Sequence, residues 1–211
     1  MTDWSVLIKG GTKMEQNKDK SNTKNKILSS AKKIFQEKGF YKTTMDEIAK
    51  EAKVAKGTLY IHFQSKKILF FEIIKNEILN IIETFQKINK NEKLNPKQKI
   101  IKGIKIASRK WAENKKFFLT LFWEAPIIKE KDLRKKQIEI WKKLVETIKT
   151  TIKEGIAKGF IVNENPEFLT FFLIGITNST ISGSIILYPE KEPPDYSNSI
   201  IKILEKGFFL K

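Results

Sequence analysis

The chain has 211 residues, of which 41 are Lys or Arg and 24 are Asp or Glu, so its formal charge is +17 at pH 7. It contains no Cys and one His, which excludes disulfides, thiolate metal sites and cysteine nucleophiles and leaves little acid–base chemistry near neutral pH. We therefore expect no enzymatic activity, no metal and no cofactor. The positive charge favours an anionic partner such as nucleic acid, although a compositional bias towards Lys explains the excess equally well.

Residues 1–22 are polar and basic and show no hydrophobic periodicity, which predicts a flexible N-terminal arm; Met14 is an alternative start of the native protein. From residue 23 the pattern becomes that of a helix. Gly39 supplies a left-handed residue that ends this helix, and Phe40 follows where it can pack back onto Phe35. The apolar stripe consists of Ile27, Leu28, Ala31, Ile34 and Phe35.

A second helix opens at Thr44, because Thr44 and Glu47 have the spacing of a capping box. Small residues at positions 49 and 52 allow close packing of this helix. A short segment, residues 55–63, follows after a tight turn and is anchored by Leu59 and Phe63, which lie four residues apart on one face. Two short helices behind a supporting first helix predict a helix-turn-helix unit.

The rest of the chain predicts further helices and no strand. Ser65 caps a helix over 66–89, Pro96 opens one over 96–113, and Asn165 with Pro166 opens one over 166–187. The other predicted helices are 115–124, 129–158 (ended by Gly159) and 196–209. The predicted fold is all-α: an N-terminal three-helix helix-turn-helix DNA-binding domain (23–66) is followed by a larger helical region (67–211).

One helix raises the question of a membrane span. Residues 168–188 carry no charge and are numerous enough to cross a bilayer. They include a dense cluster of Ser, Thr and Asn, which is typical of a helix buried against a partner and not of one that faces lipid. The sequence also shows no secretory signal. We therefore expect no membrane association and a cytoplasmic location.

The run from Ile27 to Leu69 resembles the DNA-binding domain of TetR-family transcriptional regulators. The resemblance lies in three motifs and their spacing: AxxxFxxxGF from Ala31 to Phe40, TTMDEIAKEAKV from Thr43 to Val54, and KGTLYIHFQSK from Lys56 to Lys66. The second half of the chain shares only the family's general habit of divergent helices, and the resemblance implies that residues 67–211 form an effector-binding (ligand-binding) and dimerisation domain.

The resemblance implies a role for each matching residue. Thr43 and Thr44 would touch DNA phosphates. Residues at the start of the recognition helix would approach base edges: Ala55, Lys56, Gly57 and Thr58. Others would contact the DNA backbone: Tyr60, His62 and Lys66. The alternatives are packing of Tyr60 on the first helix, an ordinary solvated Lys56, and a Thr44 that serves only as a cap.

Two positions depart from the family pattern. Ala55 stands where a capping Ser is common, so one cap is missing, and Lys67 replaces a common acidic residue. The recognition segment also contains no Arg, the usual reader of guanine. We therefore expect modest guanine readout, with thymine-methyl contacts from Ala55 and Thr58.

Aromatic residues of the second half are core residues by default. The resemblance implies that some of them line an effector pocket, and the candidates are Trp111, Phe117, Phe118, Phe122, Trp123, Trp141 and Phe172. No charged cluster indicates what the effector is.

The helix over 166–187 carries a face of small residues that lets another backbone come close, either within the chain or in a second copy. Since the family pairs its last two helices across a dimer interface, we expect a homodimer. The predicted interface residues are Gly175, Asn178, Ser179, Ser182, Gly183, Ile201, Leu204 and Phe208.

These features together predict a TetR-type transcriptional regulator, a repressor by preference, that binds a palindromic double-stranded DNA operator as a homodimer. A small-molecule effector of unknown identity would release it. Two alternatives remain open: a nucleic-acid-binding protein without sequence preference, and a membrane-associated helical protein.

Overall fold

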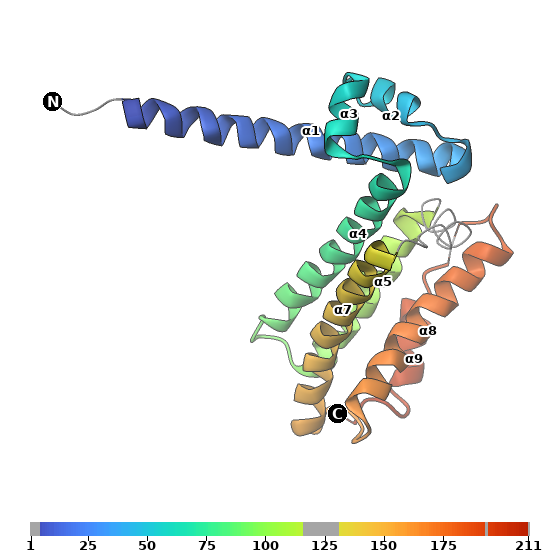
Figure 1. The fold of residues 1–211 in the computed structure, drawn as a ribbon. Coiled ribbons are helices and arrows are strands. Elements are labelled where there is room, and N and C mark those ends of the chain that lie inside the picture. The colour runs from blue at the N-terminus through green and yellow to red at the C-terminus, as the bar shows by residue number, and fades with distance from the viewer. Residues whose placement is uncertain (1–4, 116–130, 193, 211) are drawn as a thin grey trace. The chain divides into compact units, whose positions relative to one another are not determined.

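A computed structural model describes residues 5–115, 131–192 and 194–210, with residues 5–18 described by their backbone alone. The described residues are almost entirely helical, and their β-structure is limited to one antiparallel bridge between Ile161 and Phe209. This confirms the all-α prediction. The helices are α1 (Ser5–Lys42), α2 (Met45–Glu51), α3 (Lys56–His62), α4 (Lys66–Asn89), α5 (Pro96–Glu113), α7 (Lys131–Ala157), α8 (Pro166–Leu187) and α9 (Ser197–Leu204) (Figure 1).

The chain divides into two compact units, and the division falls inside α4, between Ile73 and Ile74. The sequence predicts a boundary between residues 66 and 67, at the start of this helix. The assignment of a function to each domain stays a prediction. The two units are described separately below.

Helix α1 begins at Ser5, so the segment over residues 5–22, which the sequence predicts to be a flexible arm, is helical. Residues 5–22 contain no Pro, so nothing in them stops a helix nucleated further along from extending towards the N-terminus. The helix is interrupted at Gly39, whose φ of 78° is a conformation that residues with a side chain rarely adopt. The interruption brings the Phe40 ring to 5.7 Å from that of Phe35, as the sequence predicts.

The N-terminal unit has a tightly packed aromatic and aliphatic core. Helix α2 packs against α1 and α3, and the rings of Phe35 of α1 and Phe70 of α4 meet edge to face at 5.3 Å. Fully buried side chains come from all four helices: Ile27, Phe35, Ile48, Leu59, Leu69 and Phe70. Burial of these apolar side chains is the main force that holds the unit together.

The C-terminal unit consists of residues 74–89 of α4 together with α5, α7, α8 and α9 (Figure 1). Capping residues mark the start of two of its helices. Asn95 and Gln98 form a capping box at α5, and the Asn165 side chain accepts hydrogen bonds from the first backbone N–H groups of α8. The bounds of α4, α5 and α8 are those that the sequence predicts. Helix α7 ends at Ala157, one residue before the predicted end, and residues 116–124 of the predicted helix over 115–124 lie outside the described residues.

Polar contacts join the helices of the C-terminal unit at several points. The Asn89 amide donates to the Thr147 carbonyl oxygen at 2.9 Å and accepts from the Thr151 hydroxyl at 2.6 Å. Lys99, which is 5% exposed, is paired with Glu154 at 3.0 Å. A buried amine needs such a partner, because removal from water disfavours its charge.

Helix α9 ends at Leu204, earlier than the predicted residue 209. The residues after it turn back and pair with the connection between α7 and α8. Val162 N–H donates to the Phe208 carbonyl oxygen and Leu210 N–H donates to the Phe160 carbonyl oxygen, each at 3.0 Å. We call this pairing of residues 160–162 with 208–210 the terminal bridge.

Candidate DNA-binding surface and effector cavity

The helix-turn-helix unit is built from local signals. The Thr44 hydroxyl accepts from Glu47 N–H at 3.2 Å, and the Glu47 carboxylate accepts from Thr44 N–H at 2.9 Å, which completes the capping box. Lys53 has a φ of 52°, and Val54 N–H donates to the Ala49 carbonyl oxygen at 3.0 Å. This left-handed residue reverses the chain between α2 and α3.

The same carboxylate joins α2 to α1. Glu47 lies 2.6 Å from the Lys38 ammonium, and this hydrogen bond, together with those from the Thr44 backbone and hydroxyl, lowers the pKa of Glu47 from its ordinary value of 4.5 to about 2. Helix α2 therefore begins with a carboxylate that stays ionised over most of the acid range.

One face of the recognition helix α3 is buried in the N-terminal unit, and the opposite face is exposed to solvent. Leu59 is 0% and Phe63 is 1% exposed, whereas Tyr60 is 42% and Ile61 is 82% exposed. Ala55 caps α3 without a side-chain hydrogen bond, as the missing Ser predicts. Ile61 is a surface residue that the sequence analysis did not single out; its position between Tyr60 and His62, off the Leu59–Phe63 face, is the available signal.

Gly57 occupies the exposed N-terminal end of α3. A Cβ atom built at this position would meet no atom within 4 Å, so packing inside the protein does not require glycine here. A glycine on a helix lowers its stability relative to alanine. The position therefore suits a close approach by a partner outside the chain.

Lys56 is paired within the unit. Its ammonium lies 2.8 Å from the Asp46 carboxylate of α2, and both side chains are well exposed. The hydrogen bond to Asp46 and the charge of its carboxylate raise the pKa of Lys56 above its ordinary value. An exposed pair of this kind is worth little, so Lys56 can exchange Asp46 for a phosphate or a base at small cost.

Two residues that the resemblance assigns to DNA have other partners in this structure. Thr43 is 1% exposed, and its hydroxyl donates to the Gly39 carbonyl oxygen at 2.6 Å. The structure thus places the Thr43 side chain in the core, where it fixes the interruption of α1, and leaves Thr44 at the surface.

Lys66 is held by the end of α1. Its ammonium donates to the carbonyl oxygens of Phe40 at 2.7 Å, Thr43 at 2.6 Å and Tyr41 at 3.3 Å, and it lies 4.5 Å from the centre of the Phe40 ring. Carbonyl groups at the end of a helix lack partners within that helix. Lys66 supplies the missing donors, so the geometry indicates a positioning residue for the segment that leads into α2.

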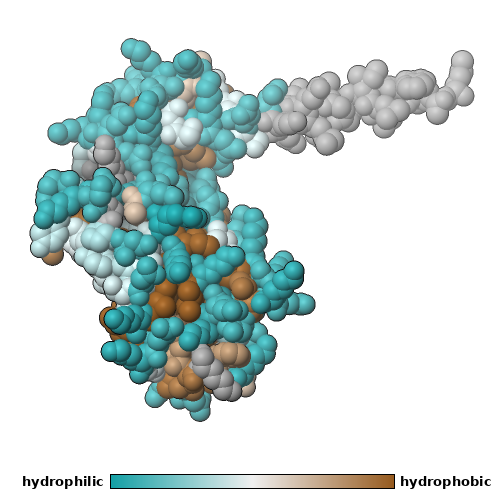
Figure 2. All heavy atoms as spheres, turned by 180° about the vertical axis from the view of Figure 1, so that it is seen from behind, coloured by the Kyte–Doolittle hydropathy of each residue, from teal (hydrophilic) through white to brown (hydrophobic). Residues whose placement is uncertain are grey.

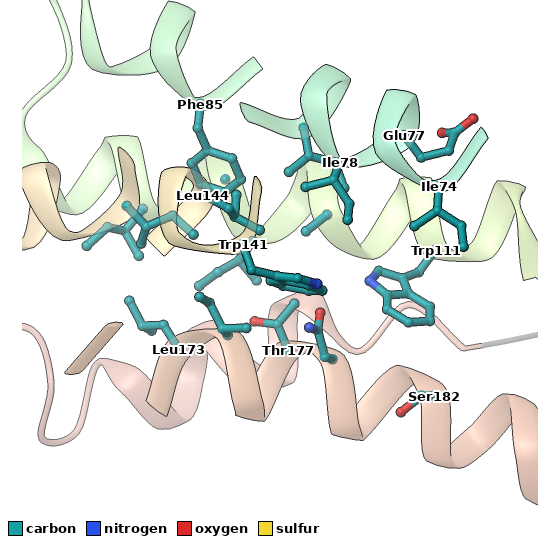
Figure 3. Close-up of a pocket in the computed structure, with 18 of the residues that line it drawn as sticks. Ile74, Glu77, Ile78, Phe85, Trp111, Trp141, Leu144, Leu173, Thr177 and Ser182 are labelled. Atoms are coloured by element: carbon teal, nitrogen blue, oxygen red, sulfur yellow. The ribbon is translucent and has the colours of Figure 1, made fainter. Parts of the chain in front are cut away.

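The C-terminal unit encloses a cavity of about 410 Å³ between α4, α5, α7 and α8 (Figure 3). This volume lies within the range of about 300–1,000 Å³ that is typical of small-molecule sites. The wall is mostly aliphatic and aromatic: Ile74, Ile78, Ile81, Phe85, Ile100, Gly103, Ile104, Ala107, Trp111, Trp141, Leu144, Ile148, Leu173, Ile174, Ile185 and Ile186. Its polar members are Glu77, Gln137, Thr177, Asn178 and Ser182.

Two of the predicted pocket residues, Trp111 and Trp141, line this cavity. Phe172 does not, because it lies on the outer side of α8, where it is 41% exposed and stacks between Phe168 and Phe208. The candidates Phe117, Phe118, Phe122 and Trp123 lie outside the described residues. The isoleucines of the wall were missed, since an isoleucine on a helix stripe is typical of a filled core.

The small residues of α8 that we predict at the interface lie on two different sides of the helix. Asn178 and Ser182 line the cavity, and their place at the interface stays a prediction. Gly175 and Gly183 have open space beyond them, and Ser179 is exposed. The periodicity alone could not separate these sides, because α8 is apolar around most of its circumference.

Exposed apolar side chains extend this outer face. Phe168 is 60%, Phe171 is 55% and Ile203 is 60% exposed. Leu204 at the end of α9 and Phe208 in the terminal bridge, which we predict at the interface, are 2% and 5% exposed and belong to the core of their own unit. Ile201 is half-buried. Figure 2 shows hydrophobic atoms gathered on the C-terminal unit, while hydrophilic atoms cover most of the visible N-terminal unit.

Helix α8 is also, among the described residues, long and apolar enough to cross a membrane. In the structure it packs against α5, α7 and α9. A third of its most apolar window, 33%, is buried, and its polar residues Thr177 and Asn178 face the cavity. A core helix or a signal sequence can pass the same test of length and composition, so this test alone is weak evidence for a membrane span.

A supporting helix, a capped second helix and an exposed third helix define a helix-turn-helix DNA-binding protein. Residues 27–73 match the family model described as bacterial regulatory proteins, tetR family. Residues 27–73 thus carry the DNA-binding domain of TetR-family transcriptional regulators, which are not enzymes, and the resemblance noted in the sequence is confirmed.

Similar proteins with known names are regulators too. The chain is 25% identical over 195 residues to the fatty acid metabolism regulator protein of Bacillus subtilis, an alignment that covers 88% of this chain and 95% of that protein. It is 44% identical over 52 residues to IcaR of Staphylococcus aureus, the negative transcriptional regulator of the biofilm operon icaADBC, which covers 25% of this chain and 28% of IcaR.

Solved structures share the fold over most of the chain. FadR from Bacillus subtilis, in complex with stearoyl-CoA, has a TM-score of 0.72 at 22% identity and covers 86% of this chain and 97% of its own. A putative fatty acid metabolism regulator from Clostridium perfringens has a TM-score of 0.67 at 28% identity, with 85% of this chain and 94% of its own covered.

Proposed function

We propose that this regulator binds a palindromic DNA operator as a homodimer and acts as a repressor. The observation that carries the proposal is the exposed N-terminal half of α3, fixed from below by Leu59 and Phe63. Ala55, Lys56, Gly57 and Thr58 would approach bases in the major groove, and Thr44, Tyr60 and His62 would contact phosphates. Such a protein works where the DNA is, in the cytoplasm.

The operator can be found by selection of bound genomic fragments, followed by titration of the best fragment against an excess of unrelated DNA. Sequence-specific binding should survive the competitor, and Lys56→Ala should weaken it. Thr150→Arg, an exposed change on α7, is the control. Equal affinity for all duplexes would favour a protein that binds nucleic acid without sequence preference.

The outer face of α8 supports the homodimer. Exposed Phe168, Phe171 and Phe172 lie on the same helix as two glycines with open space beyond them. An apolar helix face of this kind is expected to be covered, and a two-fold axis lets the same face of a second copy cover it. Two recognition helices would then reach successive major grooves, roughly 34–36 Å apart.

Sedimentation tests this interface. Ser179→Arg places a charge in the middle of the face and should yield monomers at micromolar concentration. Thr150→Arg adds the same side chain on the exposed side of α7 and should leave a dimer. A dimer of the Ser179→Arg variant that is as stable as that of the wild type would place the interface elsewhere.

We further propose that the effector carries a long acyl chain and that its binding in the cavity releases the operator. The wall is largely apolar, and burial of each methylene contributes about 0.8 kcal/mol. The similarity to a regulator solved with stearoyl-CoA supports the same chemistry. Addition of stearoyl-CoA to the protein–operator complex should release the DNA, while free coenzyme A should not.

A further inference from the structure

The cavity is elongated, and its two ends differ in chemistry. Its wall follows α4 from Ile74 to Phe85 and α8 from Leu173 to Ile186, which corresponds to roughly 16 Å and 20 Å of helix at 1.5 Å per residue. A volume of about 410 Å³ spread over this length is narrow. The cavity therefore has the proportions of a tube for one chain and not of a chamber for a globular ligand.

One end of the tube is lined by hydrocarbon side chains. Phe85, Leu144 and Leu173 lie together at this end, and Glu77, Trp111 and Ser182 lie at the other (Figure 3). We call these the apolar end and the polar end. An amphipathic ligand would be oriented by this difference, with its tail towards Phe85 and its head towards Ser182.

The apolar end owes its shape to a contact between a ring and a glycine. A Cβ atom at Gly103 of α5 would lie 2.5 Å from Cε1 and 2.9 Å from Cζ of Phe85, which is too close for any side chain. The Phe85 ring thus occupies the space that a side chain at position 103 would take. Glycine at 103 and phenylalanine at 85 together fix where the tube ends.

We propose that Phe85, held over Gly103, selects the length of the acyl chain that the regulator senses. This inference rests on the proposed acyl effector. While a chain is shorter than the tube, each added methylene is buried and should tighten binding roughly fourfold. Once the last methyl group meets the Phe85 ring, further methylenes must bend or stay in water, so the gain stops.

Calorimetric titration of the full-length protein with saturated acyl-CoA thioesters, from octanoyl to arachidoyl, tests this selection. The wild type should show an optimum, and Phe85→Ala should move it to chains at least one two-carbon unit longer. Phe85→Leu removes less side-chain volume than Phe85→Ala and can be tested in its place if the alanine variant unfolds. A parallel series with free fatty acids should show the same shift, because the ring acts on the tail whatever the head.

Ile74→Ala is the matched control, since it also removes an apolar side chain from the wall but at the start of the α4 stretch, near the polar end. It should weaken all chains alike and leave the optimum in place. An unchanged optimum in both Phe85 variants, or the same shift in Ile74→Ala, would overturn the proposal while the acyl effector stands. Failure of every acyl compound to bind wild-type protein that still binds its operator would instead reject the effector class, and the length selection with it.

Discussion

The two units of this regulator solve opposite packing problems. The N-terminal unit fills its interior with rings such as Phe35, Phe63 and Phe70, which are almost completely buried. The C-terminal unit arranges longer helices around a cavity of about 410 Å³ and has two partly exposed tryptophans, Trp111 and Trp141, at its wall.

This difference shows how one chain separates recognition from regulation. A solid core fixes the exposed residues of α3, which must match a rigid partner. An incompletely filled interior contributes less to stability. Its apolar wall can instead gain contacts when a ligand binds, and the unfilled space allows a change of conformation. Substitutions should therefore act on stability in the first unit and on ligand response in the second.

The largest expected effect tests the packing contrast itself. Phe63→Ala removes a ring that is 1% exposed and should lower the free energy of unfolding by about 3–5 kcal/mol. Trp141→Ala removes a larger ring, but one that is 38% exposed beside an existing cavity, and should cost well under half as much. Urea denaturation of the two variants measures both values, and equal losses would contradict the contrast.

A smaller effect separates structural from DNA-contacting lysines. Lys66→Met removes the donors to three carbonyl groups and should destabilise the N-terminal unit by about 1.5–3 kcal/mol, with no change in the salt dependence of operator binding. Lys56→Met should leave the melting temperature nearly unchanged and lower the log–log salt slope by about 0.9. A reduced slope for Lys66→Met would show that Lys66 contacts phosphate after all.

A substitution at Gly57 should raise the stability of the protein and weaken its binding to the operator. Gly57→Ala should raise the free energy of unfolding by about 0.5–1 kcal/mol, because nothing lies within 4 Å of the new methyl group and alanine favours a helix. Operator binding should weaken, since the methyl group stands between α3 and the groove. Gly207→Ala also points into open space and should leave operator affinity unchanged. Full operator affinity in Gly57→Ala would remove Gly57 from the DNA-binding surface.

The smallest expected effect is a dependence of the protein's stability on pH in the acid range. The folded-state pKa of Glu47, about 2, lies below its ordinary value of 4.5. The ionised carboxylate therefore adds its full contribution to the free energy of unfolding above pH 4.5, and this contribution is lost as the pH falls through the folded-state pKa. Acid titration of the melting temperature should show this loss in the wild type. Glu47→Gln should flatten that part of the profile, and Glu83→Gln, an exposed change on α4, should not.

Signals that act within a few residues were sufficient to predict most of the fold. Asn95, Asn165 and Ser65 mark helix starts by their own hydrogen bonds, and the bounds of α4, α5 and α8 agree with the prediction. The helical segment over 5–22 was not predicted, because it carries no periodic apolar face from which a helix could be inferred.

The site was only partly predictable, since it depends on contacts between residues far apart in the sequence. Nothing in the sequence shows that Lys66 turns back to the Phe40 carbonyl oxygen, or that Thr43 is buried beside an exposed Thr44. Likewise, the pattern of α8 contains both Gly175 and Asn178, but only the packing of its neighbours decides which one faces the cavity.

The terminal bridge has a topological consequence. Residues 160–162 and 208–210 hold each other by backbone hydrogen bonds, so the stretch of chain between them, which contains α8 and α9, forms a loop fastened at its base. A protease that cuts the exposed residues Tyr188–Glu192 would nick this loop without freeing either fragment. The cleaved protein should therefore migrate as one particle in a native gel and as two bands only after denaturation.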